Sequence, residues 1–337
     1  MEIVFVHFGS KFPKHLILNI KRTCDLFPNH TVVLINDRSE NIEINRSNFR
    51  RSNFTLDEDY QIVDRNLEHP KAFRNNFWFT SLARIFALCD YVILNNSPIL
   101  HIESDVLISG DFPIDRFTLC DRPIAYTVVG KQSGVASILW LENATAARNL
   151  RDYAMSSAKS EAMTTDMRIL GTFQEDFPQL IRVLVSFPNS NAKSYRSLPS
   201  QIFEDFSYTL DLFDGFFDAA DVGRYLFGDD PRNHRGFKLL RQQLATSYLL
   251  PGEMEYKYSE KRNFIDVSSS PQNRYFSLHI HSKNVKLFKE ERIPELFLRA
   301  INDQAKPTTR ILVLSTLFNS VRNSLIRRLK VVIAGKD

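Results

Sequence analysis

The stretch from Ile3 to Ile35, IVFVHFGSKFPKHLILNIKRTCDLFPNHTVVLI, sets the expected fold. Its first part, Ile3 to Phe8, is an apolar run typical of a buried strand, and a glycine and a serine mark the turn that follows. The segment from His15 to Cys24 predicts a helix, because apolar side chains recur every four residues. Residues Thr31 to Ile35 predict a second strand. Strand, helix and strand in this order indicate a βαβ unit and a mainly parallel sheet.

The first two predicted strands end in residues suited to a ligand site. In parallel sheets, ligands bind beyond the carboxyl ends of the strands. Phe8 and Gly9 close the first strand and Asp37 follows the second, so we expect these three residues near a bound nucleotide. A turn or a helix-capping role is the alternative for Asp37.

Further along the chain, helical and strand patterns alternate. Residues 39–70 are rich in Asn, Arg and Asp and predict a loop with short elements. From Phe73 to Cys89 the apolar side chains lie on one helical stripe, which predicts a helix. Residues Arg122–Val128 and Ser137–Trp140 predict further strands, and Ala144–Met155 predicts another helix.

The strongest chemical signal is the segment from Pro98 to Val106, an apolar run with two carboxylates near its C-terminal end. Residues i and i+2 of a strand point to the same side, so Glu103 and Asp105 are predicted to converge on one cation. Paired oxygen ligands suit a hard ion such as Mg²⁺ or Mn²⁺ that bridges to phosphates. The motif therefore predicts nucleotide-sugar chemistry. The simpler alternative is an acidic pair on a solvated loop.

Two histidines form a second candidate site. In the segment from Phe276 to His281, alternation places the apolar residues on one face and His279 and His281 on the other, as on the rim of a strand. His281, nearer the strand end, is the first choice as a metal ligand, and a pair of structural polar residues is the alternative. Lys283 is a candidate to offset the charge of a diphosphate, or else a solvated lysine.

The segment from Phe213 to Asn233 is dense in acids, glycines and aromatic residues. Carbohydrate pockets combine aromatic faces with carboxylates that bind hydroxyls, which makes Asp218 a functional candidate. A capped surface helix that begins near Asp218 and ends at Gly228 explains the same residues.

Composition restricts the classes of partner. The chain of 337 residues carries a net charge of +4 without long basic runs in its body, so a nucleic-acid partner is not expected. Its three cysteines lack CxxC spacing and fit reduced thiols. We find neither a basic leader nor an apolar segment long enough to span a bilayer, and therefore expect a cytoplasmic protein. P-loop, dinucleotide-binding and zinc-protease motifs are absent.

The last part of the chain, residues 306–337, is predicted to be a segment separate from a domain that spans residues 1–305. Apolar side chains from Leu314 to Val332 fall on one helical face, and every charged residue between Arg310 and Ala334 is basic. Helices of this kind lie on anionic membranes, so residues 308–334 are expected to reach the inner face of the membrane. Packing of the apolar stripe onto the protein's own core is the alternative.

Five segments follow one another in an order that matches a known family. They are Thr80–Arg84, Leu100–Val106, Ser133–Leu139, Thr164–Leu170 and His279–Lys283. Together they resemble the GT-A-fold glycosyltransferases with a DxD motif, which include capsular and lipopolysaccharide sugar transferases. The resemblance covers roughly residues 1–290. The chain departs from the family pattern at two places. Glu103 stands where the family has aspartate, and residues 95–98 replace the Gly-Gly turn of the family.

The resemblance implies an α/β, Rossmann-like GT-A fold, to which the pattern of residues 306–337 adds a C-terminal amphipathic helix. It implies an enzyme that moves a sugar from a nucleotide-diphosphate sugar to a hydroxyl of a glycan or glycolipid, with retention of the anomeric configuration. Mn²⁺ or Mg²⁺ would be held by Glu103, Asp105 and His281 or His279. Glu103 would alternatively contact the ribose of the donor.

Other polar residues are candidates for roles in the same site. Asp166 and Asp218 are the candidate catalytic residues on the donor-sugar and acceptor side. Arg84 would neutralise charge on the diphosphate or hold the acidic strand, and an ordinary helix ion pair is its alternative. Two other functions stay open, a metal-dependent nucleotidyl- or phosphotransferase and a non-catalytic, membrane-peripheral binding protein with this fold.

Overall fold

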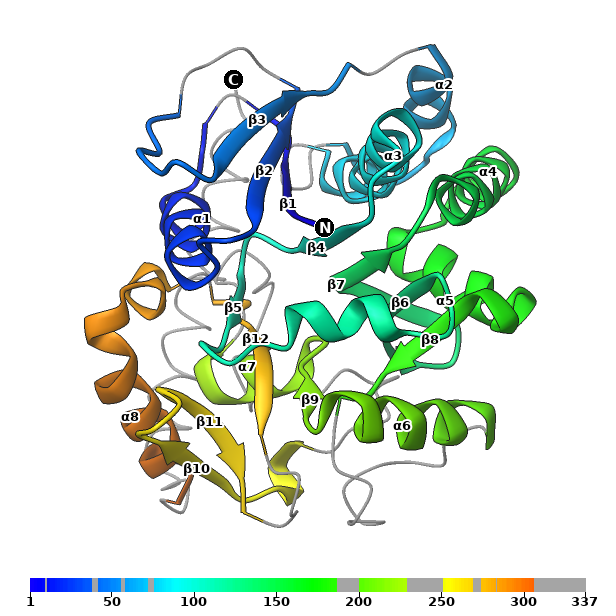
Figure 1. Ribbon diagram of the computed structural model, residues 1–337. Helices are drawn as coiled ribbons and strands as arrows, with labels where there is room; N and C mark the ends of the chain where they lie inside the picture. The colour runs from blue at the N-terminus through cyan, green and yellow to red at the C-terminus, as the bar shows by residue number, and fades with distance from the viewer. Residues whose placement is uncertain are drawn as a thin grey trace, which may run out of the picture.

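The computed structural model describes residues 1–9, 11–37, 42–55, 58–71, 76–186, 200–228, 251–268, 274–282 and 284–305. The expectations for Lys283 and for residues 306–337 lie outside the described residues. Figure 1 shows a large twisted sheet with helices on both faces and a smaller group of strands beside it.

The main sheet contains seven strands in the order β3-β2-β1-β4-β7-β6-β8. Neighbouring strands are parallel except at β7, which runs antiparallel to β4 and β6. The strands are β1 (Glu2–His7), β2 (Thr31–Asn36), β3 (Phe49–Asn53), β4 (Ile99–Ile102), β6 (Ile124–Gly130), β7 (Ser133–Leu141) and β8 (Ile181–Leu184). The predicted α/β class with a mainly parallel sheet is confirmed.

The predicted opening βαβ unit is present as β1, α1 (Lys14–Leu26) and β2. Leu16, Ile20 and Cys24 of α1 are buried against the sheet, because a spacing of four residues keeps them on one face of the helix. Apolar residues of β1 alternate between the layer with α1 and the layer on the opposite face. Both faces of this sheet are thus covered, as parallel sheets require.

Three helices cover the opposite face, namely α3 (Phe77–Asn95), α4 (Ala144–Ser160) and α5 (Asp166–Asp176). The side chains of Asn143 and Thr165 accept backbone N–H groups at the starts of α4 and α5. Such caps satisfy amide groups that have no partner within the helix, and they fix where each helix begins.

Helix α3 corrects one expectation from the sequence. By length and composition it is apolar enough to cross a membrane, whereas no segment of that length was expected. However, 61% of the apolar window is buried inside the fold, where α3 packs on β1, α4 and α5. A core helix of a globular domain has this combination of length, hydropathy and burial.

A smaller sheet lies beside the main one, with strand order β5-β12-β9. It consists of β5 (Val106–Ile108), β12 (Tyr275–His279) and β9 (Phe216–Phe217), and β12 runs antiparallel to β5 and parallel to β9. A separate hairpin pairs β10 (Tyr256–Ser259) with β11 (Phe264–Val267). Since β5 follows β4 closely in the chain, it links the two sheets.

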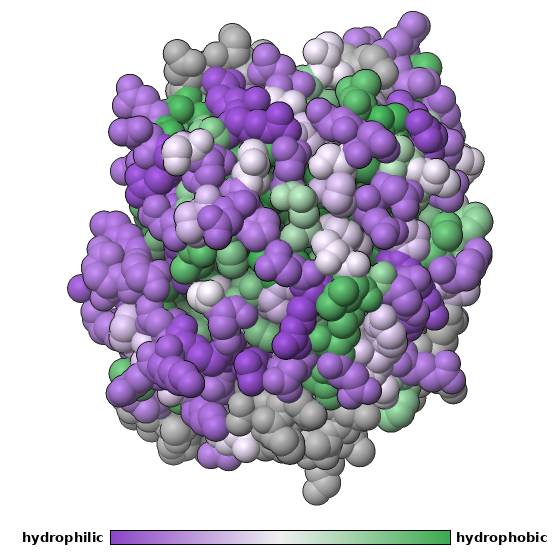
Figure 2. Space-filling view, viewed as in Figure 1, coloured by the Kyte–Doolittle hydropathy of each residue, from purple (hydrophilic) through white to green (hydrophobic). Residues whose placement is uncertain are grey.

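The remaining elements complete the layers. They are α2 (Glu58–Asn66), η1 (Ile114–Leu119), η2 (Pro178–Leu180), α6 (Ser200–Phe213), α7 (Asp221–Phe227), η4 (Pro251–Glu253), η5 (Val285–Phe288), η6 (Glu290–Arg292) and α8 (Ile293–Ala305). The polar stretch 39–70 thus contains β3 and α2, and the helix expected from Asp218 to Gly228 begins at Asp221. The face in Figure 2 is mostly hydrophilic, with apolar side chains gathered in separate patches.

Candidate metal centre

The two carboxylates of the strongest motif lie on a turn rather than on a strand. β4 ends at Ile102 and β5 begins at Val106, so Glu103 to Asp105 connect strands of different sheets. The expected single strand with both carboxylates on one side is therefore wrong. Val106 N donates to Glu103 O and Glu103 N donates to Ser137 O, both at 3.0 Å. The turn stands at the carboxyl end of β4, the edge where parallel sheets bind ligands.

Strand β12 brings a histidine to this turn. His279 pairs with Val106 in the antiparallel ladder, and its Nε2 lies 3.2 Å from Glu103 Oε2 and 3.5 Å from Asp105 Oδ1. One ligand atom from each of the three residues lies within 4.8 Å of the others. Within the described ranges, this is the one group of three or more His, Cys, Asp or Glu side chains that close together. All three residues are buried.

The hydrogen bonds of His279 fix the direction of its ring. Its Nδ1 lies 2.7 Å from Ala219 O, and because a carbonyl only accepts, Nδ1 carries a proton and Nε2 faces the carboxylates. Burial lowers the pKa of the imidazole, but the charges of Asp105 and Glu103 outweigh burial and raise the pKa to about 9. The Nε2 position therefore holds a proton that a cation can replace.

Arg84 of α3 joins the turn to α5. Its guanidinium forms ion pairs with Glu103 and, at 3.0 Å, with Asp166, the first residue of α5. Burial raises the pKa of Asp166, and the charge of Arg84 opposes that rise. The structure therefore brings the predicted residues Arg84, Glu103 and Asp166 into one charged cluster, in which Arg84 contacts the acidic segment after β4.

Asp218 lies behind His279 rather than beside the carboxylates. Its carboxylate accepts the backbone N–H groups of His279 at 2.9 Å, Val222 at 3.0 Å and Gly223 at 2.7 Å. These bonds join the end of β9 to β12 and to the start of α7. The sequence analysis did not single out Gly223, where a Cβ would lie 2.2 Å from His279 O. The sign of its importance in the sequence was a glycine inside a predicted helix.

His281 lies next to the group of three but is not a member of it. Its ring stacks on the ring of His279, with centroids 4.1 Å apart and planes at 17°. The sequence favoured His281 as the ligand, whereas the structure brings His279 to Glu103 and Asp105. The alternation that placed both imidazoles on one side of the strand agrees with this stacking.

The residues expected near a nucleotide lie along the same edge of the main sheet. Gly9 N donates to Asp37 Oδ1 at 2.9 Å, which joins the ends of β1 and β2. Gly9 has a φ of +107°, a conformation that side chains rarely adopt, and Phe8 precedes it directly. Because β1 pairs with both β2 and β4, these residues and Glu103 follow three adjacent parallel strands.

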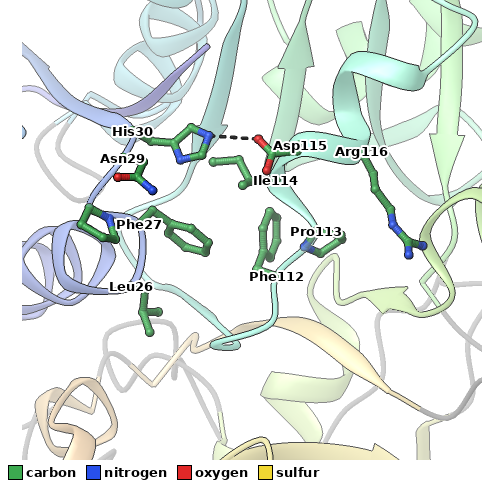
Figure 3. A pocket seen from close by; sticks show the side chains of 10 residues that line it. Leu26, Phe27, Asn29, His30, Phe112, Pro113, Ile114, Asp115 and Arg116 are labelled. Carbon is green, nitrogen blue, oxygen red and sulfur yellow. Dashed lines mark hydrogen bonds and ion pairs between the residues drawn. The ribbon is translucent and has the colours of Figure 1, made fainter.

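A cavity of about 380 Å³ lies elsewhere, between the end of α1 and η1 (Figure 3). Phe27 and Phe112 face each other in it, and His30 Nε2 lies 3.1 Å from Asp115 Oδ1 across its rim. His30 directly precedes β2, so this cavity is at the amino-terminal end of β2. The candidate metal centre is at the opposite edge of the sheet.

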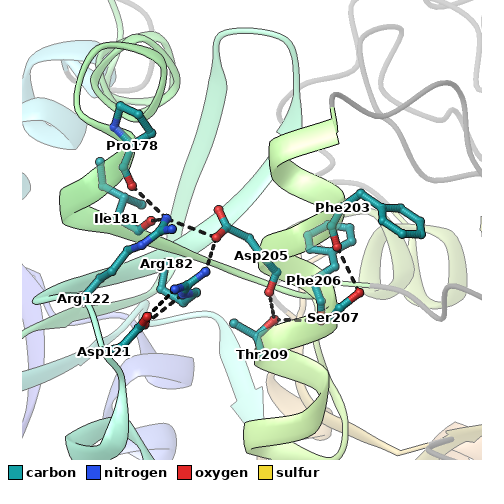
Figure 4. A network of polar contacts seen from close by, with 10 residues as sticks. All are labelled: Asp121, Arg122, Pro178, Ile181, Arg182, Phe203, Asp205, Phe206, Ser207 and Thr209. Atoms are coloured by element: carbon teal, nitrogen blue, oxygen red, sulfur yellow. Dashed lines mark hydrogen bonds and ion pairs between the residues drawn. The ribbon is translucent and has the colours of Figure 1, made fainter.

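A buried ion-pair network holds α6 against β8 (Figure 4). Asp205 of α6 pairs with Arg182 and, at 3.1 Å, with Arg122, and Arg182 also pairs with Asp121 at 2.5 Å. Only 1% of the Asp205 side chain is exposed, so its charge depends on these arginines. The chain runs from α6 directly through β9 to Asp218, so this network anchors the segment that supports His279.

No family model matches the chain, and no curated protein matches it. The solved structures with similarity to part of it include glycosyltransferases. A complex of the galactosyltransferase LgtC with donor and acceptor sugar analogs is 17% identical, with a TM-score of 0.39 over 51% of this chain and 70% of that chain. GlyE of Streptococcus pneumoniae TIGR4 is 17% identical, with a TM-score of 0.35 over 54% of this chain and 45% of that one. Mouse xyloside xylosyltransferase 1 is 8% identical, with a TM-score of 0.36 over 55% of this chain and 84% of that chain. Identities and TM-scores this low assign no activity by themselves.

Proposed function

We propose that this protein is a metal-dependent glycosyltransferase. It transfers a sugar from a nucleotide-diphosphate sugar to a hydroxyl of a glycan or glycolipid. The observation that supports the proposal is the group of Glu103, Asp105 and His279 at the carboxyl edge of the main sheet, beside the Arg84–Asp166 pair. A cation there would face the edge where Gly9 and Asp37 offer a place for a nucleotide.

The three side chains fit a divalent cation. Two carboxylates supply hard oxygen ligands, and the tautomer fixed by Ala219 leaves the Nε2 of His279 facing them. This donor set suits Mn²⁺ or Mg²⁺, with the imidazole favouring Mn²⁺. When bound, such an ion neutralises charge on the diphosphate and on the departing nucleotide as a Lewis acid.

The other residues of the site bind and orient. Arg84 forms ion pairs with both Glu103 and Asp166 and so fixes the distance between their carboxylates. Asp166 is proposed to accept hydrogen bonds from hydroxyl groups of the donor sugar. Asp218 holds the backbone of His279 in place. Lys283, outside the described residues, is proposed to offset the charge of the diphosphate.

Retention of the anomeric configuration is part of the proposal. An inverting transferase needs a general base that removes the acceptor proton, and the candidates from the sequence are Asp166 and Asp218. Asp166 is paired with Arg84, and Asp218 is bonded to three backbone N–H groups, so neither is placed as a free base. A product whose anomeric configuration differs from that of the donor would contradict this part.

The test is turnover of a panel of nucleotide sugars with Mn²⁺ and a range of glycan and glycolipid acceptors. Release of a nucleoside diphosphate together with a glycosylated acceptor supports the proposal. Release of pyrophosphate or a phosphorylated acceptor would instead indicate a nucleotidyl- or phosphotransferase. Mn²⁺-dependent thermal stabilisation by a donor without any turnover would indicate a binding protein.

A further inference from the structure

One side chain of α1, that of Asn19, forms hydrogen bonds to the backbone around Asp105. Asn19 has an exposed fraction of 0%, and its Nδ2 donates to Val106 O at 2.7 Å and to Ser104 O at 3.3 Å. These two carbonyls lie on either side of Asp105 in the chain. The Oδ1 of Asn19 has no hydrogen-bond partner among the described residues, so the fold uses its donor end.

With these bonds, every backbone carbonyl from Glu103 to Val106 has a partner. Glu103 O accepts from Val106 N at 3.0 Å, and Asp105 O accepts from Ile280 N at 2.7 Å. Asn19 supplies the donors for the other two carbonyls. Rotation of the peptide units would swing the two carboxylates apart, and it would break at least one of these buried bonds.

We propose that Asn19 is a positioning residue that sets the metal affinity of the Glu103–Asp105 turn. It acts through the carbonyls of Ser104 and Val106 and does not touch the ion. The inference rests on the proposed function, because it takes this turn as the metal site. Loss of such an outer partner typically weakens metal binding by about 10- to 100-fold.

Helix α1 also offers a matched control. Thr23 lies one turn further along the helix and is likewise 0% exposed. Its Oγ1 has no hydrogen-bond partner in the described part of the chain. Thr23→Val therefore removes a buried polar group of the same helix without loss of a bond to the turn.

Two variants test the role of Asn19. Asn19→Leu removes both bonds at similar volume, and Asn19→Asp keeps the shape but replaces the donor with an acceptor. Mn²⁺ affinity is measured by electron paramagnetic resonance at fixed pH, and the visible spectrum of bound Co²⁺ reports the coordination geometry. Urea unfolding without metal measures the stability of each variant separately.

We expect Mn²⁺ affinity to fall about 10- to 100-fold in both Asn19 variants, with a changed Co²⁺ spectrum. Thr23→Val should bind Mn²⁺ like the wild-type protein. Wild-type affinity and spectrum in a folded Asn19 variant would overturn the inference, as would an equal loss in Thr23→Val.

Asp105→Asn distinguishes this inference from the proposed function. If Asp105→Asn loses Mn²⁺ while the Asn19 variants retain it, the metal site stands and the role of Asn19 is wrong. If Asp105→Asn binds Mn²⁺ like the wild-type protein, the metal site itself is wrong.

Discussion

At the residue scale, the candidate centre depends on charged side chains that support one another. Glu103 and Asp105 are buried carboxylates, and buried charges persist only with partners. His279 lies between them, and Arg84 pairs with Glu103 from the side of α3. The charges of the cluster are therefore paired with one another, and an ion would compete with the proton of His279.

Asp105→Ala is expected to abolish Mn²⁺-dependent donor binding and to leave the fold intact. Arg84 pairs with Glu103 and Asp166, and neither pair depends on the carboxylate of Asp105, so its removal leaves these two pairs in place. Calorimetry measures the affinity and circular dichroism measures folding. Asp115→Ala, which removes a carboxylate that is 85% exposed at the distant cavity, should change neither. Unchanged Mn²⁺-dependent affinity in Asp105→Ala would remove this residue from the site.

His279→Ala is expected to weaken Mn²⁺ binding more than His281→Ala does. The sequence alone suggested the reverse, because His281 is nearer the strand end. In the structure, Nε2 of His279 is the imidazole nitrogen that faces both carboxylates. Parallel metal titrations of the two variants measure which one loses more Mn²⁺ affinity. A greater loss in His281→Ala would support the ligand suggested by the sequence.

The pH dependence of metal binding follows from the environment of His279. If His279 had the usual histidine pKa of about 6.5, Mn²⁺ affinity would begin to fall near that pH. Since the neighbouring carboxylates raise the pKa of His279 to about 9, Mn²⁺ affinity should fall up to tenfold per pH unit below about 9. Metal titrations between pH 6 and pH 10 check this. A midpoint near 6.5 would show that the carboxylates do not act on the ring as described.

The same pKa predicts how the metal-free protein responds to pH. Because the pKa is raised in the folded state, its stabilising effect is complete below about pH 6.5 and is lost as the pH rises through about 9. Urea unfolding with a chelator should show this loss for the wild-type protein. His279→Gln should lack that part of the pH dependence, and an identical profile in both proteins would assign it to other groups.

At the scale of elements, the close approach of α7 and β12 positions His279. A Cβ on Gly223 would lie 2.2 Å from His279 O and 3.0 Å from Asp218 Oδ2, so Gly223→Ala must push the helix away from the strand. We expect a loss of about 1–3 kcal/mol in the free energy of unfolding, as for overpacked cores, together with weaker Mn²⁺ binding. Gly110→Ala is the control, because its Cβ would meet its nearest atom, in Leu26, at 3.8 Å. Equal behaviour of the two variants would show that the approach is not tight.

The attachment of α6 to β8 gives a second prediction at this scale. Asp205→Ala leaves Arg182, a side chain that is 7% exposed, without its buried partner, and should lower the free energy of unfolding by about 3–5 kcal/mol. Asp121→Ala removes a carboxylate that is 48% exposed, and its effect should stay within about 1 kcal/mol. Urea unfolding measures both. Similar losses of unfolding free energy in the two variants would mean that burial does not make the Asp205–Arg182 pair more important than the Asp121–Arg182 pair.

At the scale of the whole molecule, residues 308–334 are proposed to bind an anionic membrane. The described elements run from β1 to α8, which ends at Ala305. A chain that ends at Lys306 should therefore stay folded and turn over a soluble acceptor, yet lose sedimentation with anionic liposomes. Full-length protein that never binds such liposomes, or unfolding after truncation, would assign the segment to the protein's own core.

Local patterns in the sequence were sufficient for the class of fold. The four-residue spacing in α1 and the apolar runs of β1 and β2 depend on neighbours in the chain, and such short-range periodicity is visible without a structure. The carboxyl edge of these strands also followed from the strand order alone. The sequence by itself therefore determined a mainly parallel α/β sheet and the edge at which Glu103, Asp105, Gly9 and Asp37 stand.

Only the tertiary structure decided which of these residues meet. His279 is far from Glu103 and Asp105 in sequence, and the pairing of β12 with β5 decides that His279, rather than His281, faces them. The support from Asn19 and Asp218 likewise depends on hydrogen bonds to backbone groups, which leave no pattern in the residue types. Strand register and backbone hydrogen bonds arise from packing across the whole chain, so no local segment of the sequence contains them.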